Sequence, residues 1–96
     1  MKVRSTCKLY VYSIDNKELG YYDLLDNTVN IPLNIKMLAK TMFDGMPSAL
    51  AKRGYQVSGE GTVSSINDNG RNGYEQILQG YRGILRFKAV TTVREI

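Results

Sequence analysis

Apolar and polar residues alternate at the carboxyl end of this chain, in the stretch GILRFKAVTTVREI, with the period of two that is typical of a β-strand. The odd positions from Leu85 to Val93 are mostly apolar. The even positions are Ile84, Arg86, Lys88, Val90, Thr92 and Arg94. A strand over these residues has one apolar face and one face rich in cations. The pattern predicts a half-buried strand and raises the question of what its cationic face contacts.

Residues 2–14, KVRSTCKLYVYSI, alternate in the same way. One parity carries Val3, Ser5, Cys7, Leu9 and Val11, and the other carries Lys2, Arg4, Thr6, Lys8, Tyr10 and Tyr12. The residues DNKE at 15–18 favour a turn, and LGYYDLL at 19–25 is typical of a second strand. We therefore expect a hairpin, followed by a loop over residues 26–32 that ends at Pro32.

The period changes to that of a helix from Leu33 to Arg53. The apolar stripe consists of Ile35, Leu38, Met42, Met46 and Leu50. Asn30 or Asn34 can cap its start. Because proline lacks an N–H, Pro47 predicts either one kinked helix or two short helices, over 33–43 and 47–53. Gly54 is a typical stop signal.

The remaining segments are predicted to be strands and turns. Residues 55–66 are strand-like, with a bulge expected at Gly59 and Gly61. The segment NDNGRNG at 67–73 predicts a hairpin tip or a mobile loop. Residues 74–79 fit either a continued strand or one helical turn. A closing strand follows Gly83.

The predicted order β-β-α-β-β favours an α+β fold with two layers. We expect a four-stranded, mainly antiparallel sheet, with one kinked helix or two short helices on one face and the other face open. The length of 96 residues is that of a single domain, 1–96, and the composition of 43% apolar and 23% charged residues is typical of globular proteins.

The charge and the reactive residues limit the function. Thirteen Lys and Arg against nine Asp and Glu give a net charge of +4, and the excess lies towards both ends of the chain. Cys7 is the single cysteine and there is no histidine, so a disulfide within the chain and a His/Cys metal site are excluded. We expect no enzyme activity, no cofactor and no metal. Without a signal peptide or membrane-span pattern, we expect a cytoplasmic protein that has no membrane partner.

If both terminal strands lie in one sheet, their outward residues form a shared surface of cations and tyrosines. Cations attract phosphates, and aromatic rings stack on bases. The candidate ligand-binding residues are Lys8, Tyr10, Tyr12, Arg86, Lys88 and Arg94, together with Arg71 on the predicted tip and Arg82. The alternative is a solvated strand face, because Lys, Arg, Thr and Tyr also serve solubility and β propensity.

Two functional hypotheses follow. The first is a small non-enzymatic protein that binds nucleic acid or a nucleotide-like anion. The second is a protein–protein interaction or inhibitor module that acts on an acidic surface of a larger partner. If the methionine-containing helix stripe were exposed, a homodimer would result. Neither hypothesis gains from a resemblance to a known family. Both require Phe87 to lie under the helix, with Arg86 and Lys88 on the other face.

Overall fold

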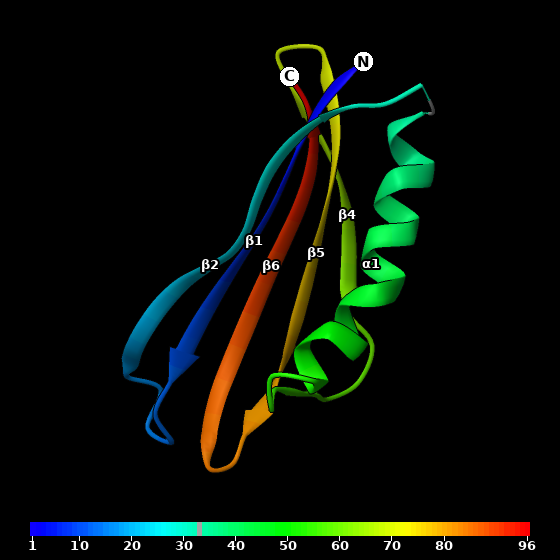
Figure 1. Cartoon of the computed structure of the whole chain (residues 1–96). Helices are drawn as coiled ribbons and strands as arrows, with labels where there is room; N and C mark the ends of the chain where they lie inside the picture. The colour runs from blue at the N-terminus through cyan, green and yellow to red at the C-terminus, as the bar shows by residue number, and fades with distance from the viewer. Residues whose placement is uncertain (33) are drawn as a thin grey trace.

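The computed structural model describes residues 1–32 and 34–96, and it has the predicted α+β fold. The elements are β1 (Lys2–Tyr12), β2 (Glu18–Asn30), α1 (Ile35–Ala51), β3 (Gln56–Val57), β4 (Thr62–Asp68), β5 (Arg71–Arg82) and β6 (Leu85–Glu95). Neighbouring strands are antiparallel in the order β2-β1-β6-β5-β3, and β4 also pairs with β5. Helix α1 lies along one face of this sheet (Figure 1).

The sheet has six strands, so the prediction of four is wrong. One additional strand is β5, and the other arises because the strand predicted over residues 55–66 is divided into β3 and β4, with a break where a bulge was expected. Gly59 has a φ of 74°, in the left-handed region, and the chain there leaves β3 before β4 begins. Both short strands pair with β5, through Gln56 opposite Tyr81 and Thr62 opposite Ile77.

Strand β5 settles the ambiguity at residues 74–79, which are extended. The hairpin tip predicted within 67–73 is confirmed at Asn69-Gly70, where φ values of 54° and 77° match a two-residue turn with both residues in the left-handed region. The second Asn-Gly pair, Asn72-Gly73, lies within β5.

Strand β2 continues through the segment predicted to be a loop. Residues from Asp26 to Asn30 pair with β1 from Thr6 back to Lys2, so the loop prediction for 26–30 is wrong. Asp and Asn have low β propensity, but cross-strand pairing with β1 overrides it here. The register shifts by one residue between Cys7 and Lys8, which places a bulge at Leu24.

Helix α1 is continuous through Pro47, so the alternative of two short helices is wrong. Asn34 caps its start, because Asn34 Oδ1 accepts a hydrogen bond from the Met37 N–H at 2.9 Å. Leu33, where the predicted helix began, lies outside the described residues. Pro47 cannot donate to the Phe43 carbonyl, and the Gln76 side chain of β5 supplies a long hydrogen bond to that oxygen instead, at 3.5 Å. The final turns of the helix bend towards the sheet (Figure 1).

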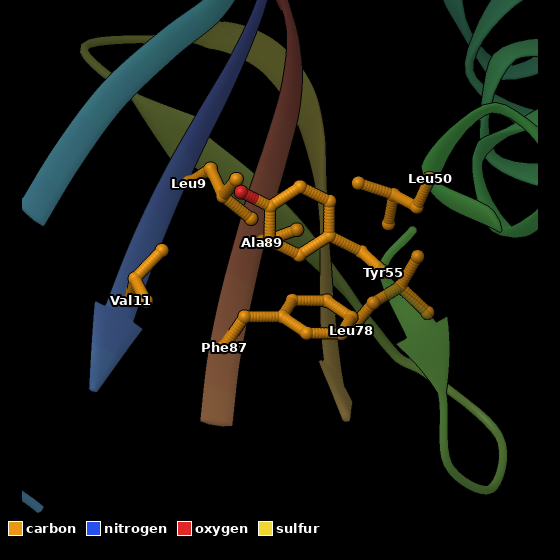
Figure 2. Close-up of a cluster of buried hydrophobic side chains, with 7 residues drawn as sticks. All are labelled: Leu9, Val11, Leu50, Tyr55, Leu78, Phe87 and Ala89. Atoms are coloured by element: carbon orange, nitrogen blue, oxygen red, sulfur yellow. The ribbon is translucent and has the colours of Figure 1, made fainter. Parts of the chain in front are cut away.

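The core lies between α1 and the sheet in two apolar clusters. One gathers Leu9, Leu50, Tyr55, Phe87 and their neighbours, with the Tyr55 ring reaching across β6 (Figure 2). The other contains Val3, Ile35, Ala39, Phe43 and Val93. The buried polar residues are Ser5, Gln76 and Thr91.

Cys7 is buried, as expected of a structural thiol. Its sulfur accepts a hydrogen bond from the Thr91 hydroxyl at 3.5 Å. Burial raises the pKa of the Cys7 thiol. The thiol is therefore protonated at neutral pH, a state that suits packing and not nucleophilic chemistry.

Two glycines test how closely the elements pack. At Gly80 an added Cβ would lie 1.9 Å from the Gln56 carbonyl oxygen of β3, whereas at Gly45 in α1 it would meet nothing within 4 Å. We expect Gly80→Ala to lower the free energy of unfolding by about 2 kcal/mol or more, because β3 must move. Gly45→Ala should raise it by about 0.5–1 kcal/mol through helix propensity.

Urea denaturation of both variants measures this difference. A Gly80→Ala variant as stable as the parent protein would show that β3 does not pack against β5 as described.

Candidate anion-binding face

Strands β1 and β6 lie side by side in the middle of the sheet, and their outward residues face the same way. Tyr10 pairs with Lys88, and Tyr12 pairs with Arg86. Phe87 is only 2% exposed and packs in the core beneath α1. Because side chains alternate along a strand, Arg86 and Lys88 lie on the side of the sheet opposite α1, which we call the open face.

Six of the eight candidate residues lie on the open face of β1 and β6, with Arg94 near the termini and the others towards the hairpin turns. They are Lys8, Tyr10, Tyr12, Arg86, Lys88 and Arg94. Arg71 lies at the far end of β5, where it lines a cavity of about 340 Å³ together with Asp68 and Arg94. It is separated along the sheet from Arg86, which pairs with the opposite end of β5 at Tyr81.

Arg82 is on the other side of the sheet from these residues. It has the parity of Leu78 and Gln76, which are buried under α1, and its guanidinium lies 5.1 Å from the centre of the Tyr55 ring. Arg82 Nη1 also donates to the Tyr55 hydroxyl at 3.4 Å. Arg82 therefore lies on the opposite side of the sheet from the candidates on β1 and β6, a placement that the sequence did not show because the buried parity of β5 was not predicted.

Acidic residues that sequence reasoning missed neutralise one half of the open face. Arg4 forms a two-pronged ion pair with Asp26 of β2, with Nε–Oδ1 at 2.9 Å and Nη2–Oδ2 at 2.8 Å. Arg94 Nη2 lies 3.7 Å from Asp68 Oδ2. Glu75 lines a shallow cavity with both arginines. In this half Arg4 and Arg94 already have carboxylate partners.

The other half of the open face holds cations without such partners. Within residues 1–32 and 34–96, no carboxylate lies within 4 Å of the charged groups of Lys8, Arg86 or Lys88. Lys88 Nζ lies 5.3 Å from the centre of the Tyr10 ring, and Lys8 Nζ lies 6.0 Å from that of Tyr21. These distances are those of cation–π contacts. We call Lys8, Tyr10, Tyr12, Tyr21, Arg86 and Lys88 the cation–tyrosine cluster.

Hydrogen bonds and ring contacts hold this cluster in place. The Tyr10 and Tyr21 rings are 5.1 Å apart between centres and inclined at 55°. The Tyr21 hydroxyl donates to Asp23 Oδ1 at 2.9 Å, and this bond raises the pKa of Tyr21. The interaction with the Tyr21 hydroxyl raises the pKa of Lys8, so this ammonium is charged at neutral pH. Tyr21 belongs to the cluster because it pairs with Tyr10 in the register of β1 and β2, and the sequence alone did not indicate this register.

The surroundings of the cluster add no sign of metal chemistry or of a membrane span. Among the residues that the structure describes, no group of three His, Cys, Asp or Glu side chains could hold a metal ion. The same part of the chain has no helix with the length and apolar character needed to cross a bilayer. Comparisons with protein-family models, curated proteins and solved structures found no match to this chain.

The ion pair between Arg4 and Asp26 makes a prediction for pH. The hydrogen bond from Arg4 lowers the pKa of Asp26. A lowered pKa in the folded state means that the pair stabilises the fold above the unfolded Asp pKa of about 3.9 and that this contribution is lost as the pH falls through the folded pKa. In a carboxyl-detected NMR titration, Asp26 should therefore titrate below 3.9, and Arg4→Gln should raise its midpoint.

Arg94→Gln is the matched control, because Arg94 contacts Asp68 and not Asp26. An Asp26 midpoint that Arg4→Gln and Arg94→Gln shift equally would contradict the ion pair.

Proposed function

We propose that this chain is a small non-enzymatic binding protein whose cation–tyrosine cluster contacts nucleic acid or a nucleotide-like anion. One observation carries the proposal. Lys8, Arg86 and Lys88 form no ion pair within the described residues, on a sheet face that α1 does not cover. The two lysines lie beside tyrosine rings, and Arg86 pairs with Tyr12 across the strands. The rest of the fold holds these side chains in fixed register.

The two kinds of side chain suit the two parts of a nucleotide. Unpaired ammonium and guanidinium groups attract phosphate, and the attraction weakens with salt as counterions are released. Tyrosine rings offer flat surfaces on which unpaired bases stack. A phosphate that binds Lys88 would draw its ammonium from the Tyr10 ring and free that ring for a base. Single strands suit such a surface better than duplexes, whose bases are already stacked.

A solvated face is the plainest alternative, because exposed strands commonly carry these residue types. The two halves of the open face differ in a way that this alternative does not require. Arg4 and Arg94 are matched with acids from neighbouring strands, as on an ordinary solvated surface. Lys8 lies opposite Asp23 of β2, whereas Arg86 and Lys88 depart from that pattern, and the unmatched charge of these two residues supports a ligand.

A protein partner is the second candidate function, and one observation favours it. Ile14 and Ile84, in the turns next to the cluster, are 73% and 77% exposed. Large apolar side chains at adjacent hairpin ends are typical of contact surfaces between proteins. In this case the basic cluster would face an acidic surface of the partner, as an interaction or inhibitor module.

Salt dependence and charge reversal test the first proposal. Binding of labelled single-stranded DNA and RNA, measured by fluorescence anisotropy, should weaken with a log–log salt slope of about −2, which corresponds to three phosphate contacts. Arg86→Glu with Lys88→Glu should abolish binding. The matched control is Lys36→Glu with Lys40→Glu, which changes the net charge equally at exposed positions of α1.

Absence of binding at low salt would contradict the proposal. Equal loss in the two double variants would also contradict it, because the attraction would then come from total charge and not from the cluster. If Ile14→Asp with Ile84→Asp disrupts a nuclease-resistant complex with another protein while nucleic acids do not bind, the second function replaces the first.

A further inference from the structure

A cavity of about 280 Å³ opens beside the cation–tyrosine cluster. Its lining residues are Tyr12, Asn16, Gln79, Arg86, Phe87 and Lys88. It forms where the turn between β1 and β2 approaches the start of β6, and where Gln79 of β5 pairs with Lys88. A second cavity, of about 170 Å³, shares Gln79, Arg86 and Phe87 with it. The first cavity is slightly smaller than a usual ligand pocket, a size that suits one base and not a folded segment.

The turn on one side of this cavity is held rigidly. Asn16 has a φ of 66°, and two backbone hydrogen bonds close the turn, from Ser13 N to Lys17 O at 2.8 Å and from Asn16 N to Ser13 O at 3.0 Å. Asn16 Oδ1 accepts from Arg86 Nη1 at 3.2 Å. Because a guanidinium only donates, this contact fixes the Asn16 amide with its oxygen on Arg86 and leaves Nδ2 as a donor.

Gln79 supplies the other polar group of the cavity. It is exposed on β5, and within the described part of the chain its amide makes no side-chain hydrogen bond. A free carboxamide offers one donor and one acceptor side by side. Adenine presents the complementary pair at N6 and N7, whereas guanine presents two acceptors there, which suit an arginine. Arg86 Nη1 is held by Asn16 Oδ1, and we assign the remaining N–H groups of Arg86 to the phosphate. Gln79 is then the group that contacts the base edge, and its donor and acceptor match adenine.

We propose that this cavity binds an adenine base that carries a phosphate, within a single strand or as a nucleotide. Gln79 pairs with the N6/N7 edge of the base, the Tyr12 ring stacks on it, and Arg86 and Lys88 contact the adjacent phosphate. The inference rests on the proposed function, because the same cations bind the phosphate. It adds the identity of the base and the residue that recognises it.

The recognition of the base is tested with uridine octamers that carry A, C, G or U at one central position. The octamers are made as RNA or DNA, whichever binds more tightly, and thymidine replaces uridine in DNA. The octamer with A should bind about 10-fold more tightly than that with U, within the discrimination that one bidentate pair provides. Gln79→Leu should reduce this preference to less than 2-fold. Gln56→Leu is the control, because Gln56 is also exposed but lies on β3, outside the cavity.

The outcomes separate the two proposals. Equal binding of all four octamers, or a preference for G, would overturn the adenine inference and leave the proposed function intact. Absence of binding by every octamer would overturn both. A preference for A that survives Gln79→Leu would overturn the role of Gln79. Titration with AMP then distinguishes a free nucleotide from a single strand as the ligand. AMP binding that depends on Gln79 supports a mononucleotide, whereas a preference for A without AMP binding supports a single strand.

Discussion

The antiparallel pairing of β1 with β6, in the register that places Tyr10 opposite Lys88, is the constraint on which the rest of the structure depends. The apolar parity of both strands is buried under α1 and Tyr55, so Leu9, Phe87 and Ala89 form the centre of the core. Because side chains alternate along a strand, the residues of the other parity must lie on the opposite, open face. Burial of apolar side chains on one face of the sheet stabilises the fold. As a consequence, the cationic side chains of the same strands are exposed on the other face.

The open face is not uniformly cationic, because some of its cations are paired with acids and others are not. Strand β2 brings Asp26 to Arg4, and β4 brings Asp68 near Arg94, so these two arginines near the termini are paired with acids. Exposed pairs of this kind contribute little to stability, but they cancel the local field. Towards the hairpin turns the cations contact tyrosine rings instead, which leaves their charge available to a ligand.

Much of this was predictable from the sequence, and the failures have physical causes. The sequence showed which residues of β1 and β6 are buried, because apolar and polar residues alternate without interruption along both of these long strands. The short strands β3 and β4, which bury few side chains, give no such signal, so one strand was predicted in place of two. The acid at Asp26 was missed because its segment has the composition of a loop, and only pairing with β1 makes it a strand. The side of the sheet on which Arg82 lies follows from which alternate residues of β5 are buried. The sequence did not indicate this, because β5 contains glycines and does not alternate clearly between apolar and polar residues.

The most direct test of the account is a map of the ligand on the folded protein. In ¹⁵N–¹H NMR spectra recorded while a single-stranded oligonucleotide is added, the account predicts shifts concentrated in residues 8–12 and 86–88. In aromatic ¹³C–¹H spectra of the same titration, the ring signals of Tyr10 and Tyr12 should shift at the same oligonucleotide concentrations. Signals of α1 and of the ion-paired end near Arg4 should change little. Shifts centred on α1, or spread evenly over all exposed lysines and arginines, would contradict the claim that the cation–tyrosine cluster is the binding site.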